Sequence, residues 1–244
     1  MFGVFLAFFF AFKPVAYEAG GITLYYPYPS LFHSFSSILF KALEKHVLPP
    51  QMKLINIGVF DTFLASIYMA VPMAAVFSMP VWIYETWSFV SPALKPKERR
   101  LVGYVVVPAS ILFLAGVLFS YEILLPILFR LMYLFTVGFG IQPTISVKAF
   151  VSIALAYMIA LGLCFEAPIV MVALTSVGLV EPKEWFSGWR YAMVGCFFIA
   201  LLISPGATGG IMEVSIALLL FTLYIGGAAV SKVIYGRRHS NTTA

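Results

Sequence analysis

Charged residues are scarce in this 244-residue sequence, and their scarcity excludes an ordinary soluble protein. Only 10% of the residues are Asp, Glu, Lys or Arg, whereas about 25% is usual for a soluble domain. Hydrophobic residues make up 62% of the chain, and the mean hydropathy is +1.00. A water-soluble fold of this length cannot hide that much apolar surface, because surface area shrinks too slowly with size. Lipid must therefore be the solvent for most of the chain.

The common sequence motifs of catalysis and metal binding are also missing. There is no GxxxxGK[ST], HExxH or GxSxG pattern, and the acidic residues show no metal-ligand spacing. Asp61 is the sole aspartate, which excludes an intramembrane protease built on an aspartate pair. Cys164 and Cys196 form no CxxC pair, so neither a disulfide framework nor a zinc site is indicated. We predict that the protein is not an enzyme and holds no metal and no cofactor.

Long apolar runs are present instead, and they predict an all-α membrane protein with six transmembrane helices in a single membrane domain over residues 1–244. The runs cover approximately residues 1–16, 62–84, 101–125, 149–174, 191–203 and 211–230. Prolines within them, such as Pro80, Pro108 and Pro168, predict kinked helices. The fifth run is too short to cross upright and meets the sixth through residues 204–210. We therefore expect the last two helices to be short, either as a pair that thins the bilayer or as a re-entrant hairpin.

A different pattern lies between the first two runs. Residues 30–48 have helical periodicity, with apolar positions such as Phe35 and Leu39 on one face and Lys41 and Lys45 among the polar positions. Ser30 can cap the start of this segment, and Pro49 follows its end. The pattern is typical of an amphipathic helix that lies at the membrane interface.

The distribution of Lys and Arg predicts the orientation in the cell membrane. Nine of these residues follow the second and fourth runs or lie in the C-terminal tail, and six are spread over the longer opposite segments. The nine are Lys95, Lys97, Arg99, Arg100, Lys183, Arg190, Lys232, Arg237 and Arg238. By the positive-inside rule this side is cytoplasmic, so both termini are cytoplasmic and the amphipathic segment is extracytoplasmic. The same asymmetry accounts for the net charge of +5 without a nucleic-acid partner.

Two carboxyl groups are candidates for a functional role. Glu166 lies well inside the fourth run, where a charged side chain costs about 2.5–3.5 kcal/mol on insertion scales. It is either a polar site in a groove or a protonated residue that bonds to a neighbouring helix. Glu98 stands among four cations in the proline-containing loop of residues 89–100, where it either balances charge or binds a guanidinium group. Asp61 and Glu213 open apolar runs and are expected to favour the N-terminal helix dipole.

Three stretches together resemble the TatC family, the multi-spanning receptor subunit of the twin-arginine protein translocase. The first and most specific runs from Ser78 to Arg100 and contains Phe89, a Pro-x-Leu at residues 92–94 and Glu-Arg-Arg at residues 98–100. The second is Phe165-Glu166-Ala167-Pro168, and the third is the pair of final runs around Ser204-Pro205. The resemblance extends from about residue 55 to about residue 235.

The resemblance implies a concave cup of six helices that recognises precursor proteins for export in the folded state. Signal peptides with two consecutive arginines bind its cytoplasmic face, where Glu98 faces the arginines and Phe89, Pro92, Leu94 and Arg99 belong to the site. Glu166 is implied to be a polar group inside the concave face, contacted by an inserted signal or by partner subunits. The implied partners are single-span subunits of the TatA/TatB type, besides membrane lipid and a second copy of the chain in a homo-oligomer. The proton-motive force drives transport.

Two features depart from the family pattern. The cytoplasmic His-Leu-x-Glu-Leu-Arg segment is not found, because the sequence opens in the first apolar run, and Pro205-Gly206-Ala207 lacks the aspartate of the family's Pro-Pro-Asp. A missing or unusually short upstream part is the expected reason for the first departure. The main alternative function is a secondary transporter of a small solute or ion that uses Glu166. An intramembrane enzyme and a structural scaffold are further alternatives.

Overall fold

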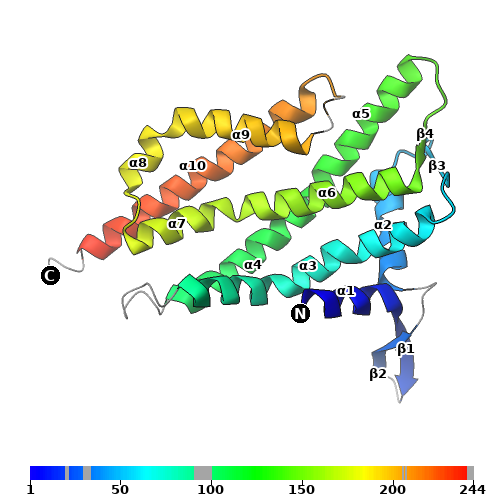
Figure 1. The fold of residues 1–244 in the computed structure, drawn as a ribbon, viewed down its shortest axis with the longest axis horizontal. Coiled ribbons are helices and arrows are strands. Elements are labelled where there is room, and N and C mark those ends of the chain that lie inside the picture. Colours follow the sequence, from blue (N-terminus) through cyan, green and yellow to red (C-terminus); the bar gives the residue numbers. More distant parts are fainter. Residues whose placement is uncertain (20–21, 30–33, 91–100, 205, 207, 241–244) are drawn as a thin grey trace. The chain divides into compact units, whose positions relative to one another are not determined.

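The computed structural model describes residues 1–19, 22–29, 34–90, 101–204, 206 and 208–240. The described chain is mostly helical (Figure 1). It divides into two compact units, one with residues 1–78 and 117–159 and the other with residues 79–116 and 160–244. The division falls within three helices, so each of those helices contributes one part to each unit.

Helices and two small strand pairs make up the described elements. The α-helices are α1 (Phe2–Ala11), α2 (Phe35–Val47), α3 (Asp61–Val90), α4 (Leu101–Phe119), α5 (Leu125–Gly138), α6 (Val147–Phe165), α7 (Ala167–Val177), α8 (Pro182–Ser187), α9 (Trp189–Ile203) and α10 (Ile211–Ser240). A π-helical turn, η2 (Ser120–Leu124), joins α4 to α5. Strand β1 (Phe12–Ala19) pairs antiparallel with β2 (Ile22–Pro29), and β3 (Lys53–Ile55) pairs parallel with β4 (Thr144–Ser146).

Four helical segments of the described chain are long and apolar enough to cross a membrane. They are Asp61–Thr86, Val106–Gly138, Val147–Val177 and Ile211–Gly236. Helices α1 and α9 are also apolar but have only 10 and 15 residues, or about 15 and 22 Å at 1.5 Å per residue, against a hydrocarbon core of about 30 Å. The protein is therefore a multi-pass membrane protein with four long spans, and the count of six stays a prediction.

The first predicted span ends earlier than the sequence suggested. Helix α1 stops at Ala11, and residues 12–16 belong to strand β1. Pro14 lacks the backbone N–H that a helix interior needs, and the paired strand β2 is rich in Tyr, Thr and Ile, which favour strands. The prediction of helix through residue 16 is therefore wrong for its last five residues.

The third and sixth spans extend further than predicted. Helix α4, turn η2 and helix α5 form a continuous segment from Leu101 to Gly138, past the predicted end at residue 125. The π-helical turn ends two residues before Pro126 and widens the backbone where a proline removes a hydrogen-bond donor. Helix α10 has 30 residues, so the prediction of a short last helix is wrong. Cationic residues in its sequence after Val230 suit a helix C-terminus, and no proline interrupts it.

The first unit packs its N-terminal helix through aromatic side chains. Phe9 is buried, and its ring lies 5.6 Å from Phe35 of α2 and 5.1 Å from Phe77 of α3. The buried hydroxyl of Ser36 donates a hydrogen bond of 2.9 Å to the Phe9 carbonyl oxygen. Helix α2 thus has a buried side, and its Lys41 and Lys45 are exposed, as expected of an amphipathic helix.

The other side of α2 meets the π-helical turn of the same unit. His46 Nε2 lies 2.9 Å from Glu122 Oε2, and the His46 ring stacks on Tyr121 with centroids 4.9 Å apart. The Tyr121 hydroxyl also donates to the Ala42 carbonyl oxygen at 3.4 Å. Glu122, which lies in the predicted third span, therefore has a partner on the amphipathic helix.

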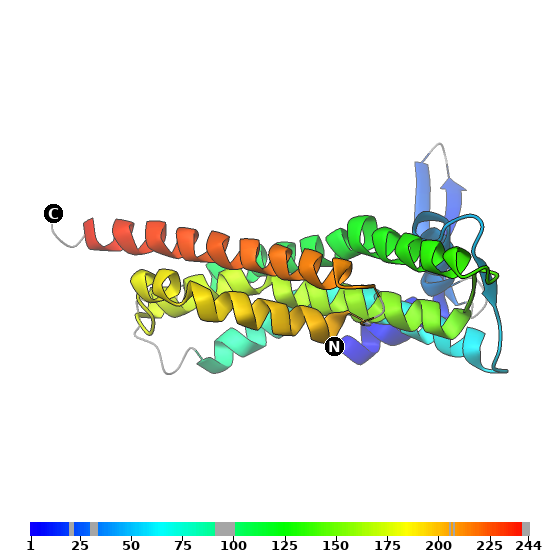
Figure 2. The same ribbon diagram turned by 90° about the horizontal axis from the view of Figure 1, so that it is seen from above.

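Glycines allow close helix contacts in the second unit. A Cβ atom on Gly116 of α4 would lie 2.6 Å from the Leu161 carbonyl oxygen, and one on Gly162 of α6 would lie 2.7 Å from the Phe113 ring. Helix α10 packs alongside both α7 and α9 (Figures 1 and 2). At the α10–α7 contact a Cβ on Gly227 would lie 2.8 Å from Pro168 Cα. Small residues at such crossings are the usual means of membrane helix packing.

Candidate functional site

The long segment formed by α6 and α7 is interrupted at Glu166. Helix α6 ends at Phe165 and α7 begins at Ala167, with Pro168 in its first turn. Pro168 has no N–H to donate to the carbonyl four residues before it, which removes one helical hydrogen bond at this point. The Glu166 N–H bonds instead to the Leu163 carbonyl oxygen at 3.1 Å. The predicted kink therefore places Glu166 at a helix break in the middle of a membrane span.

Glu166 lines a small, mainly apolar pocket of the second unit. The pocket has a volume of about 230 Å³. Its other lining residues are Met79, Trp82, Ile83 and Thr86 of α3, Ala109 of α4, and Leu163, Ile169 and Val170 of the α6–α7 segment. The C-terminal half of α3, the middle of α4 and the break between α6 and α7 thus converge on one carboxyl group.

One oxygen of this carboxyl group is unused. Glu166 Oε1 is buried and has no hydrogen-bond partner among the described residues. A buried polar atom without a partner costs about 1–3 kcal/mol, and the described residues offer no compensating contact for it. The pocket can therefore take up a polar or cationic side chain from outside the chain, whose hydrogen bond would satisfy this oxygen. The alternative from the sequence, a carboxyl group paired with a neighbouring helix for packing, finds no support at Oε1.

The residues predicted for signal-peptide binding fall at the end of α3 and in the loop after it. Phe89 lies in the last turn of α3 and is 87% exposed. Pro92, Leu94, Glu98 and Arg99 lie outside the described residues. Their assignment to a site therefore stays a prediction.

Glu213 makes contacts that the sequence did not reveal. The residue is 4% exposed, and its carboxylate accepts hydrogen bonds from the hydroxyls of Ser204 at 2.7 Å and Thr208 at 2.8 Å. It therefore ties the first turn of α10 to the connection that follows α9. From the sequence, Glu213 is expected only to interact favourably with the dipole at the N-terminus of the helix. The available signal was a serine and a threonine shortly before an acidic residue in a first helical turn, a pattern related to helix capping.

The described part of the chain shows no group of three or more His, Cys, Asp or Glu residues that could hold a metal ion.

Comparison with known proteins identifies the family. The family model described as "Sec-independent protein translocase protein (TatC)" matches residues 1–218. A TatC protein of Cenarchaeum symbiosum is 31% identical over 207 residues, which cover 85% of this chain and 78% of the relative. TatC of Escherichia coli K12 is 28% identical over 85% of this chain and 77% of its own length.

The fold agrees with this assignment. A crystal structure described as the twin arginine translocase receptor TatC superposes with a TM-score of 0.70 at 28% identity. The superposition covers 82% of this chain and 87% of that one. The family match includes both the segment from Ser78 to Arg100 and the Glu166 break. The chain belongs to the TatC family of Sec-independent protein translocase proteins.

Proposed function

We propose that this chain is the receptor subunit of a twin-arginine translocase in the cell membrane. It binds the twin-arginine signal peptides of folded precursor proteins and organises single-span subunits of the TatA/TatB type for export driven by the proton-motive force. The observation that carries the proposal is the family match over residues 1–218, which includes the loop motif and Glu166. The concave cup of six helices and the cytoplasmic location of both termini are parts of this proposal.

The signal peptide is proposed to bind at the loop between α3 and α4. A carboxylate at Glu98 can accept two parallel hydrogen bonds from one arginine guanidinium group, a geometry that lysine cannot match. A fully exposed ion pair contributes only about 0–1 kcal/mol, and a charge-assisted bidentate pair contributes about 1.5 kcal/mol, so apolar contacts must supply most of the affinity. Phe89, with 87% of its surface exposed, is suited to such a contact, and Leu94, Pro92 and Arg99 complete the proposed site.

Glu98→Ala is expected to weaken binding of a twin-arginine signal peptide about tenfold, equivalent to about 1.4 kcal/mol. The physical reason is the loss of the carboxylate that receives the guanidinium group. The measurement is a binding titration with a labelled peptide and the full chain in lipid nanodiscs. Glu44→Ala, on α2 of the other unit, is the matched control and should bind normally. Wild-type affinity in Glu98→Ala would remove Glu98 from the site.

The second part of the proposal concerns Glu166, whose pocket is proposed to receive a polar side chain of an inserted signal or of a single-span subunit. The unpartnered Oε1 and the apolar walls support this role. Because Oε1 has no intramolecular bond to lose, Glu166→Leu should leave the melting temperature in detergent unchanged or raise it. The same variant should retain peptide binding at the loop and co-purify with less of the single-span subunit.

A packing role for Glu166 predicts the opposite result. If the side chain held neighbouring helices together, Glu166→Leu would lower the melting temperature. Glu166→Gln, which keeps a hydrogen-bonding side chain, would then lower it less. Membership of a protein translocase family counts against the alternative of a secondary transporter. That alternative requires solute uptake by proteoliposomes that contain this chain alone, with uptake lost in Glu166→Gln.

A further inference from the structure

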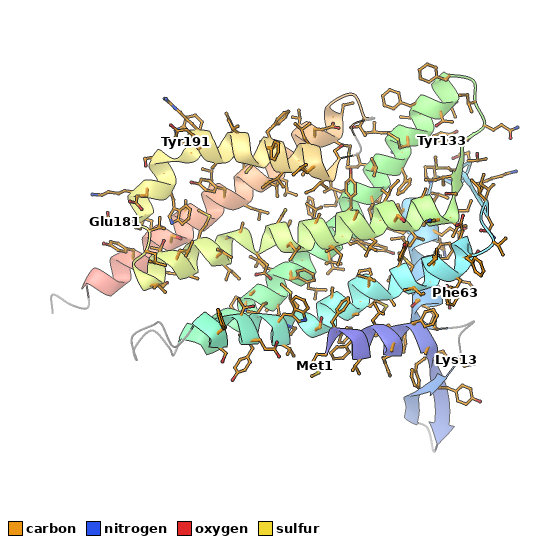
Figure 3. The ribbon with its side chains drawn as sticks, in the orientation of Figure 1. Met1, Lys13, Phe63, Tyr133, Glu181 and Tyr191 are labelled. Atoms are coloured by element: carbon orange, nitrogen blue, oxygen red, sulfur yellow. The ribbon has the colours of Figure 1, made fainter. Side chains whose placement is uncertain are left out.

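A second and larger pocket lies in the same unit, between α8 and the last turns of α10. It has a volume of about 630 Å³ and is lined mainly by Pro182, Lys183 and Phe186 on one side and by Lys232 and Tyr235 on the other. Figure 3 shows Glu181, another lining residue, at the start of α8. The proposed function uses none of these residues.

The walls of this pocket are held by side-chain hydrogen bonds. The Tyr224 hydroxyl of α10 donates to the Trp185 carbonyl oxygen of α8 at 2.6 Å. Trp185 Nε1 in turn donates to Thr175 Oγ1 of α7 at 2.9 Å, and the Trp185 and Tyr224 rings meet edge to face. These bonds fix α8 against two neighbouring helices, so the pocket exists before any ligand binds.

The charges that line the pocket favour an anion. Lys183 and Lys232 supply two ammonium groups, and Lys232 Nζ lies 6.0 Å from the centre of the Phe186 ring. Glu181 is the opposing charge among the lining residues, and its backbone N–H donates to Glu184 Oε2 at 3.1 Å where α8 starts. The lining therefore carries a net charge of +1 (two lysines and one glutamate).

The position of the pocket points to a lipid. Lys232 lies in the last turns of the apolar segment Ile211–Gly236, at the polar end of a membrane span. Phe186 and Pro182 add apolar wall beside the two ammonium groups. A phospholipid matches both parts of the lining, because its anionic phosphate suits the lysines and its hydrocarbon suits the apolar wall. A small free anion would leave the apolar wall uncovered. Basic residues next to a membrane span are the usual partners of anionic lipid headgroups.

We infer that the pocket between α8 and α10 binds one anionic phospholipid, with the phosphate between Lys183 and Lys232 and the start of an acyl chain against Phe186. The site does not depend on the signal-peptide site, because it uses other residues and needs no partner protein. A lipid held there would cover the junction of α8 with α10.

The test is a titration of the purified full chain in non-ionic detergent with phosphatidylglycerol, followed by native mass spectrometry, with phosphatidylcholine as the reference lipid. One phosphatidylglycerol should bind preferentially. Lys183→Gln and Lys232→Gln should each weaken binding about fivefold, and the double variant about 25-fold. Glu181→Gln removes the opposing charge and should strengthen binding severalfold, a gain that misfolding cannot produce. Lys53→Gln combined with Lys148→Gln, both exposed in the other unit, is the charge-matched control.

Three outcomes would overturn the inference. One is equal binding of phosphatidylglycerol and phosphatidylcholine, and another is an equal loss in the control and in the lysine double variant. The third is binding of glycerol phosphate with the same affinity as phosphatidylglycerol, which would show that the acyl chain contributes nothing and would indicate a site for small anions.

Discussion

Gly227→Ala is expected to destabilise the protein by about 2 kcal/mol, whereas Gly226→Ala should be neutral or slightly stabilising. A Cβ atom at position 227 would lie 2.8 Å from Pro168 Cα and 2.9 Å from Met171 Sδ, so α10 must move away from α7. Forcing an extra carbon into a close helix contact costs about 1–3 kcal/mol. The midpoint of thermal unfolding in detergent should fall by roughly 4–8 °C.

The neighbouring glycine gives this experiment its control. Gly226 is exposed on the same helix, and a Cβ there would meet nothing within 4 Å. Alanine at position 226 therefore tests only helix propensity, which favours alanine over glycine by up to about 1 kcal/mol. Equal unfolding midpoints for the two variants would show that α7 and α10 do not approach each other as described.

The movement of α10 away from α7 in Gly227→Ala should also change the shape of the Glu166 pocket. Pro168, which contacts Gly227, lies two residues after Glu166 in the first turn of α7. Gly227→Ala should therefore lower the amount of single-span subunit that co-purifies, as is also expected for Glu166→Leu. The two variants should differ in melting temperature, because Glu166→Leu breaks no intramolecular hydrogen bond at Oε1.

Glu213→Leu is expected to have the second large effect, a loss of about 3 kcal/mol. The substitution leaves the hydroxyls of Ser204 and Thr208 buried without their acceptor, at a cost of about 1–3 kcal/mol for each unsatisfied group. It also removes a carboxylate from the first turn of α10, where the helix dipole favours negative charge. Thermal unfolding in detergent and the rate of proteolytic cleavage between α9 and α10 measure the effect.

Three further variants separate this hydrogen-bonded connection from general effects of substitution. Glu213→Gln keeps one acceptor oxygen and should lose less stability than Glu213→Leu. Ser204→Ala in the Glu213→Leu background should cost little more, because the two residues act through the same bond. Ser215→Ala removes an exposed hydroxyl that donates to the Ile211 carbonyl oxygen of its own helix and should be neutral. Additive losses at Ser204 and Glu213 would contradict the described contact.

The sequence predicted the class of the fold because lipid imposes a simple requirement on it. Apolar runs such as those starting near residues 62 and 149 must be helical, since the bilayer offers no other hydrogen-bond partner to the backbone. Proline predicted the interruption near Pro168 because it removes a helical hydrogen bond, but α3 continues through Pro80 and α4 through Pro108. The prediction of helix was wrong where an apolar run is not helical over its whole length. The Phe-rich N-terminal run predicts a single span, but Pro14 and the paired β2 strand turn its end into a hairpin.

The contacts of the candidate sites could not be predicted, because they depend on how separate segments pack. Glu166 was recognised as unusual from its depth in an apolar run, but the unused oxygen and the walls from α3 and α4 follow only from the fold. Glu213 was assigned to a helix dipole because its hydroxyl partners lie before the helix begins. Gly226 and Gly227 look alike in sequence, and only the position of α7 distinguishes them.

The receptor function is tested most directly by the affinity of the wild-type chain for two signal peptides that differ only in the paired arginines. The chain in lipid nanodiscs should bind the twin-arginine peptide about tenfold more tightly than the same peptide with both arginines changed to lysine, because lysine cannot reproduce the bidentate bond to a carboxylate. Glu98→Ala should abolish this preference. Equal affinity of the wild-type chain for the two peptides would contradict the proposal that it is a twin-arginine signal receptor.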